Sequence, residues 1–319
     1  MTSSSARDRG ITAVLRLHSL GDVVLAQPAA EELAGSGRVS FVTSSEYLPV
    51  VRRMEGVEPV PHRRNSGAAG LRSLLGELAP ERIVDLQNNL TTRIATLGMT
   101  VRGRFSLQRG LRKKILAGGG GTMPSRRLEY LRAAGFSSGD MPVLSRNGPG
   151  PDRLTVGIAA GSRWRLKSIP EGVIAEAARL FIDLHGAEVV ITGGPGEEGT
   201  VAGVAASVMR GGVSTYCGED GIEGLMRVIE GLSLLVSPDS GPAHLAAALG
   251  VPVMVVFTST SPALGFWEDG YASFFSSGSL ECRPCHRHGG QVCRRGDEEC
   301  RRSIVPLELV DSAMGIMDR

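Results

Sequence analysis

The chain has 319 residues, of which 42% are hydrophobic and 21% charged, and its net charge is +2. A soluble protein of this size has a large core and most naturally two domains. The near-neutral charge argues against a nucleic-acid-binding protein, and no apolar run is long enough to cross a bilayer. Because the N-terminal residues lack the apolar segment of a secretion signal, we expect a cytoplasmic protein without a transmembrane segment.

The N-terminal half reads as an α/β domain. Residues 11–17 predict a strand, residues 18–22 a turn, and the following apolar residues a helix; further strands are predicted at 39–44 and 82–87, with helices between them. Strands that alternate with helices indicate a mostly parallel sheet. Asp22 follows Gly21 at the first strand–helix turn, where a carboxylate can cap the helix or act as a general base facing a cleft.

A basic stretch covers residues 102–132. Its only acidic residue is Glu129, and GGGGT at 118–122 makes part of it flexible. Such a run is either a solvated face or a landing site for an anionic partner. Few aromatic residues interrupt it, which argues against single-stranded nucleic acid. The cations are Arg102, Arg104, Arg109, Arg112, Lys113, Lys114, Arg126, Arg127 and Arg132.

Residues 145–153, SRNGPGPDR, form the best linker in the chain, because Pro and Gly dominate and no apolar periodicity crosses them. We therefore place the domain boundary here, with domains at 1–149 and 150–319. The second half restarts the strand–helix alternation at 154–160. Two α/β domains in tandem put a cleft between the carboxyl edges of their sheets, which is where ligands bind in such folds.

Two loops in the second half could meet phosphate. Lys167 lies on a glycine-containing loop after the strand at 154–160; it is either an exposed lysine or a phosphate partner. Residues 194–199 match G-x-G-x-x-G, which keeps a nicotinamide oxidoreductase open as an alternative. The motif follows the second strand of its domain rather than the first, and no hydride-transfer site is apparent. A glycine loop with Glu197 beside it suits a single nucleoside equally well.

The segment LLVSPDSGPAHLAAALG at 234–250 reads as a buried strand, a tight turn and a helix. Asp239 or Ser240 can cap that helix, whose free N–H groups and partial positive charge suit a phosphate. His244 lies within about one and a half helical turns of the same site. The alternative is an ordinary capped turn.

Four cysteines gather near the C-terminus as C-x2-C-x7-C-x6-C, at Cys282, Cys285, Cys293 and Cys300. In a reducing cell this density suggests a small structural zinc site, although the spacing between pairs is short. Free thiols or a disulfide are the other interpretations.

These segments together resemble the ADP-heptose:lipopolysaccharide heptosyltransferases, glycosyltransferase family 9. The resemblance rests on GD at 21–22 and DSGPAH at 239–244, on the terminal cysteines, and on the segments at 16–29, 83–95, 159–170 and 189–198. It implies a GT-B fold, two Rossmann-like doubly wound domains that face each other across a cleft. The N-terminal domain would bind the acceptor and the C-terminal domain the nucleotide sugar.

The resemblance also implies the chemistry. Heptose would move with inversion from ADP-heptose to the inner core of lipopolysaccharide, with Asp22 as general base and no metal or other cofactor needed for catalysis. Lys167 and the backbone N–H groups of Ser240 and Gly241 would meet the pyrophosphate, and Asp239 would hold the donor sugar. His244 would lie beside the reacting centre and Glu197 would meet the ribose.

The basic stretch, represented by Arg112, Lys113 and Lys114, would bind the anionic lipid A–core acceptor at the inner face of the inner membrane. Nucleic acid is not an expected partner. The loop at Lys167 and the segment 262–270 depart from the family pattern, which leaves two alternatives open. One is a family-9 glycosyltransferase with another nucleotide sugar and a different glycan acceptor, and the other is a binding module without activity.

Overall fold

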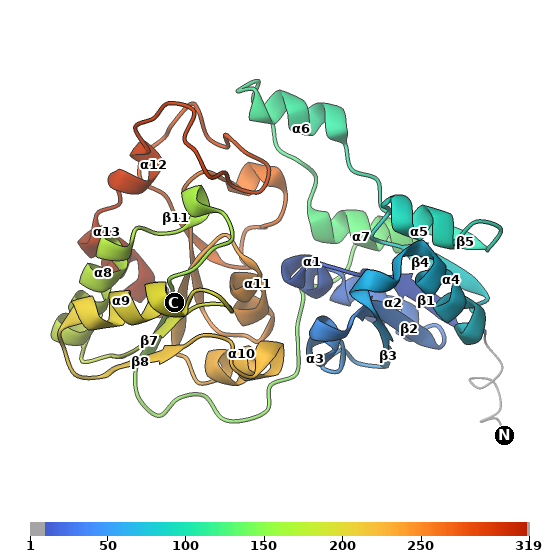
Figure 1. The fold of residues 1–319 in the computed structure, drawn as a ribbon, viewed down its shortest axis with the longest axis horizontal. Coiled ribbons are helices and arrows are strands. Elements are labelled where there is room, and N and C mark those ends of the chain that lie inside the picture. Colours follow the sequence, from blue (N-terminus) through green and yellow to red (C-terminus); the bar gives the residue numbers. More distant parts are fainter. Residues whose placement is uncertain (1–9, 318–319) are drawn as a thin grey trace. The chain divides into compact units, whose positions relative to one another are not determined.

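The computed structural model describes residues 10–317, which divide into two compact units, each built on one parallel sheet (Figure 1). The first unit contains the chain through Leu107 and residues 124–145, and the second contains residues 108–123 and the chain from Arg146 onward. The basic segment 108–123 thus belongs to the second unit by its contacts, although it lies in the N-terminal half of the sequence. The boundary at 149/150 stays a prediction about independently folding pieces.

The first sheet has five strands in the order β3-β2-β1-β4-β5, all parallel. The inner strand β1 is buried along its whole length and is apolar after Thr12, as expected for a strand with helices on both faces. The strands are β1 (Thr12–Leu15), β2 (Val39–Ser44), β3 (Val57–His62), β4 (Arg82–Asp85) and β5 (Val101–Arg104). The helices of this unit are α1 (Leu20–Leu25), α2 (Gln27–Ala34), α3 (Leu48–Val51), α4 (Gly67–Leu78), α5 (Leu90–Ala95) and α7 (Arg126–Ala134).

Both edge strands of this sheet, β3 and β5, were not predicted from the sequence. Pro59 and Pro61 interrupt β3, and a strand with prolines is confined to a sheet edge, where the missing N–H groups cost little. The polar sequence VRGR of β5 carries no strand pattern. Its Gly103 is required by packing, because a Cβ there would fall 1.8 Å from the carbonyl oxygen of Ala133 in α7.

The second sheet has six parallel strands in the order β11-β10-β9-β6-β7-β8. Its strands are β6 (Thr155–Ala159), β7 (Glu188–Thr192), β8 (Val213–Tyr216), β9 (Leu234–Pro238), β10 (Val253–Val256) and β11 (Ser273–Phe275). Its helices are α6 (Arg109–Leu116), α8 (Glu171–His185), α9 (Glu198–Val208), α10 (Gly221–Glu230), α11 (Gly241–Ala248), α12 (Glu299–Arg302) and α13 (Pro306–Met314). The predicted doubly wound α/β class is confirmed for both units.

Each unit has its own apolar core between sheet and helices. In the first unit the core includes Ala13, Leu15, Val42, Val60, Leu71, Leu75 and Ile83. In the second it includes Val156, Ile158, Ile174, Phe181, Val189, Ile191, Val236 and Val256.

The strand order reverses next to β1 in the first unit, between β1 and β4, and next to β6 in the second, between β6 and β9. At such a point neighbouring connections leave for opposite faces, so the carboxyl ends of the two strands border a crevice where ligands bind. Asp22 follows β1, Lys167 follows β6 and Asp239 follows β9. The fold therefore delivers the predicted catalytic and donor-binding residues to the ligand-binding edge of their own units.

Candidate functional site

Asp22 lies in the first turn of α1 and is the centre of a buried polar cluster in the first unit. Its Oδ2 is 2.5 Å from Arg16 Nη2 and accepts a hydrogen bond from Ser19 Oγ at 3.0 Å. Its Oδ1 accepts a hydrogen bond of 2.6 Å from the hydroxyl of Tyr130 in α7. The N-cap position of α1 is Ser19, so Asp22 is not the helix cap.

The charge of Asp22 is stabilised by its neighbours. Burial by itself raises the pKa of this carboxyl, but Arg16, Arg126 and the Tyr130 hydroxyl outweigh burial and lower the pKa to about 2. Arg126 Nε lies 3.9 Å from Oδ1, and the Arg126 guanidinium lies over the ring of Phe105, 4.5 Å from its centroid. Asp22 is therefore ionised at neutral pH and fixed in orientation.

His18 is a second titratable group at this edge. Gln87, which follows β4, accepts hydrogen bonds from the backbone N–H groups of Leu17 and His18 through Oε1, so its amide NH₂ faces His18 Nε2 at 3.2 Å. This arrangement makes Nε2 the acceptor. Burial, followed by the charges of Arg16 and Arg64, lowers the pKa of His18, which favours the same neutral imidazole.

Lys167 and Asp239 form the central contact of the second unit. Lys167 ends a 3-10 turn (Arg165–Lys167), and its Nζ lies 3.1 Å from Asp239 Oδ2. Thr260 Oγ1 donates to the same oxygen at 2.9 Å, and Trp267 Nε1 donates to Oδ1 at 2.8 Å. Burial opposes ionisation of Asp239, but Lys167 and Trp267 lower its pKa overall.

The turn from β9 into α11 presents backbone donors beside this pair. Ser240 occupies the N-cap position with extended backbone and no side-chain cap bond; its Oγ lies 3.0 Å from Ser237 Oγ. Gly241 is the first helical residue. One turn further, the His244 ring stacks on Trp267 with centroids 3.9 Å apart and planes at 9°. Trp267 thus fixes both the carboxylate of Asp239 and the ring of His244.

Glu197 lies at a neighbouring cavity of the second unit rather than in the Lys167–Asp239 contact. Its Oε2 accepts a 2.7 Å hydrogen bond from the backbone N–H of Gly194. The side chain crosses over Gly161 so closely that a Cβ there would lie 1.6 Å from Oε2. A cavity of about 230 Å³ opens here, lined by Gly161, Ser162, Arg165, Ser168, Glu197 and Arg301 among others.

The cysteine-rich segment packs against the Lys167 loop. Leu166 N donates to Gly290 O at 2.8 Å, and Arg165 forms an ion pair with Glu298 at 2.5 Å. Cys285 N donates to Ser259 O, one residue before Thr260. This part of the chain therefore braces the residues that hold Asp239.

All five cysteines are free thiols in this structure. Burial, followed by neighbouring cysteines of the same segment, raises the pKa of Cys285, and burial raises that of Cys300 to about 11. In residues 10–317 no three His, Cys, Asp or Glu side chains are arranged to hold a metal ion. The present arrangement of Cys282, Cys285, Cys293 and Cys300 thus does not form the predicted zinc site, and a structural zinc stays a prediction.

Arg112, Lys113 and Lys114 lie on α6, which belongs to the second unit by its contacts. The side chains of Lys113 and Lys114 are exposed and that of Arg112 is half-buried. Their role toward an acceptor stays a prediction.

Sequence reasoning missed the partners of the site carboxylates. Arg16, Tyr130, Thr260 and Trp267 were not among the predicted site residues, yet they hold Asp22 and Asp239 in place. The one available signal was position, because Arg16 directly follows β1 and Thr260 follows β10 by four residues.

Two doubly wound parallel sheets, each with polar residues gathered where its strand order reverses, define a GT-B type of glycosyltransferase architecture. Comparisons with known proteins agree. Residues 136–290 match the sequence model of glycosyltransferase family 9 (heptosyltransferase). The chain resembles this family over those residues, which make up a little less than half of its length.

Known relatives are distant in sequence and close in fold. Lipooligosaccharide heptosyltransferase 2 of Campylobacter jejuni is 24% identical over 184 residues, which cover 55% of this chain and 54% of that protein. The match thus spans about half the length of this relative. The crystal structure of a glycosyl transferase family 9 protein from Veillonella parvula matches with a TM-score of 0.77 at 17% identity, covering 98% of this chain and 99% of that one. E. coli ADP-heptose LPS heptosyltransferase II matches with a TM-score of 0.74 at 17% identity, covering 97% and 98%.

Proposed function

We propose that this protein is an inverting glycosyltransferase that moves a heptose from ADP-heptose to an inner-core sugar of lipopolysaccharide. The observation that carries the proposal is the pair of buried, ionised carboxylates, Asp22 and Asp239, each located where the strand order of its sheet reverses. The match to the family model and the names of the two heptosyltransferases that the chain resembles support the donor and the acceptor class.

In the proposed reaction Asp22 accepts the proton of the acceptor hydroxyl as that oxygen bonds to the anomeric carbon of the heptose. The bond between that carbon and the pyrophosphate oxygen breaks, and ADP leaves with the electron pair. Attack from the opposite face inverts the configuration. Lys167 and the backbone N–H groups at Ser240 and Gly241 stabilise the charge that develops on the leaving phosphate. Asp239 and His244 hold the donor sugar, and Glu197 meets the ribose.

A pKa of about 2 makes Asp22 a weak base, because proton transfer is most efficient when the pKa of the base lies near the working pH. Binding of the acceptor is expected to raise this pKa. An acceptor that carries phosphate or carboxylate groups competes with Asp22 for the guanidinium groups of Arg16 and Arg126. Drawing these cations toward the acceptor raises the pKa of Asp22, so the base gains strength when the acceptor is bound. Lys113, Lys114 and Arg112 add further positive charge for the same ligand.

Asp22→Asn tests the base role, since it keeps the shape of the side chain and removes the proton acceptor. Turnover should fall roughly 10²- to 10⁴-fold, with ADP affinity by calorimetry unchanged, because the residues proposed to bind the donor belong to the other unit. Asp140→Asn, at an exposed site of the same unit, is the matched control and should keep full turnover. Near-normal turnover in Asp22→Asn would remove Asp22 from this role.

The donor is tested by calorimetry with ADP and UDP. Tight ADP binding with weak UDP binding supports an adenosine diphosphate donor. The reverse order would instead indicate a family-9 enzyme with a different nucleotide sugar and glycan. Reactions with and without a chelator test the expectation that catalysis needs no metal.

A further inference from the structure

Helix α5 of the first unit has its polarity reversed relative to an ordinary amphipathic helix. Its buried positions are Thr92 and Ala95, followed by the buried Thr96. Its outward face carries Leu90 and Ile94, and Leu97 follows two residues after the helix ends; these residues are 74%, 46% and 65% exposed, respectively. A helix of a globular protein normally turns such residues toward the core. We call these three residues the α5 apolar stripe.

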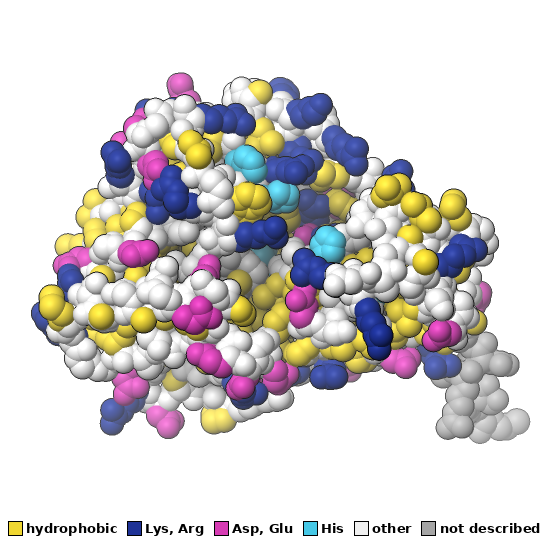
Figure 2. Space-filling view, in the orientation of Figure 1, with side chains coloured by type: hydrophobic (Ala, Val, Ile, Leu, Met, Phe, Trp, Pro, Cys, Tyr) yellow, Lys and Arg dark blue, Asp and Glu magenta, His cyan; other side chains and the backbone are white. Residues whose placement is uncertain are grey.

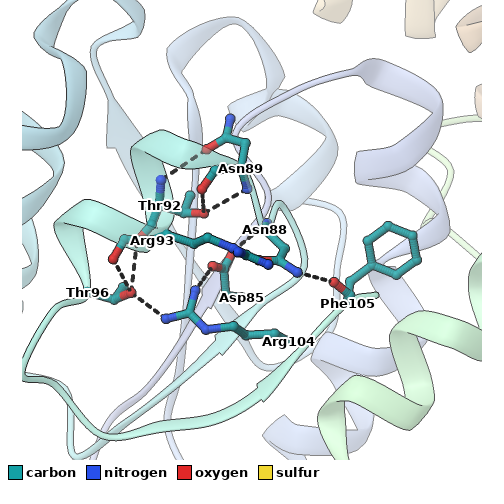
Figure 3. Close-up of polar contacts among 8 residues, drawn as sticks. All are labelled: Asp85, Asn88, Asn89, Thr92, Arg93, Thr96, Arg104 and Phe105. Carbon is teal, nitrogen blue, oxygen red and sulfur yellow. Dashed lines mark hydrogen bonds and ion pairs between the residues drawn. The ribbon is translucent and has the colours of Figure 1, made fainter. Parts of the chain in front are cut away.

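A network of part-buried polar contacts holds α5 in this orientation (Figure 3). Asn89 caps the helix by accepting from Thr92 N at 3.0 Å, and the Thr92 hydroxyl accepts from Asn89 N at 3.1 Å. At the other end Arg104 of β5 donates to Thr96 Oγ1 at 2.7 Å.

The same arginine forms an ion pair of 2.6 Å with Asp85, which is fully buried. Rolling the helix to bury the α5 apolar stripe would break these bonds and leave the Asp85–Arg104 pair short of partners, which is costly. The stripe is therefore held outward by the fold.

The surroundings of the stripe are basic. Arg93, in the middle of α5, is exposed and donates to Asn88 Oδ1 at 2.8 Å. Arg72 of the neighbouring helix α4 donates to the carbonyl oxygens of Ala95 and Leu97, at 3.1 and 2.8 Å. Between Leu86 and Leu128 the sequence contains no Asp or Glu at all. Figure 2, in the orientation of Figure 1, shows hydrophobic side chains over α5 with Lys or Arg side chains beside them.

We infer that the α5 apolar stripe, with Arg72 and Arg93, is a docking surface for an anionic lipid bilayer. Exposed apolar side chains among cations match the apolar boundary and the negative head groups of such a bilayer. A second copy of this chain fits less well, because a two-fold interface places the same patch on both sides and so brings like charges together. The inference extends the proposed function, whose acceptor is an anionic glycolipid, but lipid binding is measurable without turnover.

The test is flotation of the full-length protein with vesicles. One set contains phosphatidylglycerol and phosphatidylcholine in equal parts, and the other contains phosphatidylcholine alone. The wild type should bind the anionic vesicles, more weakly at high salt, and should bind the neutral vesicles poorly. The triple variant Leu90→Ser, Ile94→Ser, Leu97→Ser should lose on the order of tenfold or more in partitioning. Arg72→Gln with Arg93→Gln should lose roughly tenfold and flatten the salt dependence.

The matched control replaces two exposed apolar residues of the second unit, Leu184→Ser and Met209→Ser, which are 58% and 75% exposed in the wild type. It should bind vesicles like the wild type. Equal binding by the stripe variant and the wild type, or equal binding to both kinds of vesicle, would overturn the inference. So would a concentration-dependent dimer that the stripe variant abolishes, which would assign the surface to a second copy.

Turnover measured with ADP-heptose and a delipidated acceptor separates this inference from the proposed function. If turnover is normal and vesicle binding absent, the docking surface alone is wrong. If vesicle binding follows the stripe and no heptose is transferred, the proposed reaction alone is wrong.

Discussion

Lys167 Nζ lies 3.1 Å from Asp239 Oδ2, so the cation proposed to meet the pyrophosphate already neutralises the carboxylate proposed to hold the sugar. Both side chains are largely buried, and Asp239 keeps two further donors, Thr260 and Trp267. The contact couples donor binding to the stability of the second unit.

Lys167→Met should weaken ADP binding on the order of 10- to 100-fold, because a charged hydrogen-bond partner of the phosphate is lost. It should also destabilise the protein by roughly 3 kcal/mol, since Asp239 is left as a buried charge without its cation. Calorimetry and urea unfolding measure the two effects. Adding Asp239→Asn to Lys167→Met should restore stability but not ADP binding. If the double variant is no more stable than the single one, the coupling is absent.

Tyr130→Phe should raise the pKa of Asp22, by roughly one unit, because it removes a hydrogen bond to the ionised carboxyl. Carbon NMR of the Asp22 carboxyl, titrated into acid, reads this directly. Tyr47→Phe, on another helix of the same unit, is the control and should leave the titration of Asp22 unchanged. An unaltered pKa in Tyr130→Phe would mean that Arg16 and Arg126 alone set the charge of Asp22.

Acid should remove a defined part of the stability of the first unit. The pKa of Asp22 is depressed, from 3.8 to about 2, so its contribution is complete above the unfolded pKa and is lost as the pH falls through the folded one. The shift corresponds to about 2 kcal/mol. The difference in unfolding free energy between wild type and Asp22→Asn should therefore shrink by that amount between about pH 5 and pH 2. A difference independent of pH would contradict the ion-paired geometry.

Gly161→Ala should act on nucleotide binding through Glu197. The new Cβ would occupy the place of the Glu197 carboxylate, whose flexible end can move away. Displacing it breaks the bond from Gly194 N and removes the group proposed to meet the ribose. ADP affinity should fall several-fold, about as much as in Glu197→Ala, and the double variant should be no worse than either single one. Additive losses would show that Gly161 acts independently of Glu197.

The sequence predicted the doubly wound class and the inner strands, because buried parallel strands are continuous apolar runs. The sequence also indicated that Asp22, Lys167 and Asp239 lie at the ligand-binding edges of their sheets, because each residue follows an inner strand. It could not pair Asp22 with Tyr130, which is 108 residues away and reaches the carboxylate only through the packing of α7. The orientation of α5 was equally hidden. Leu90, Ile94 and Leu97 have the spacing of a core-facing stripe, and only the capping and ion-pair network turns them outward.

In both sheets the proposed site residues lie at the carboxyl ends of the strands. The turns at the opposite edge only connect one element to the next. The turns there, around Ser36 in the first unit and Gly186 in the second, are exposed and carry no proposed site residue. Inserted peptides or fluorescent labels at these turns should thus be tolerated, and would offer each unit a reporter remote from its own chemistry.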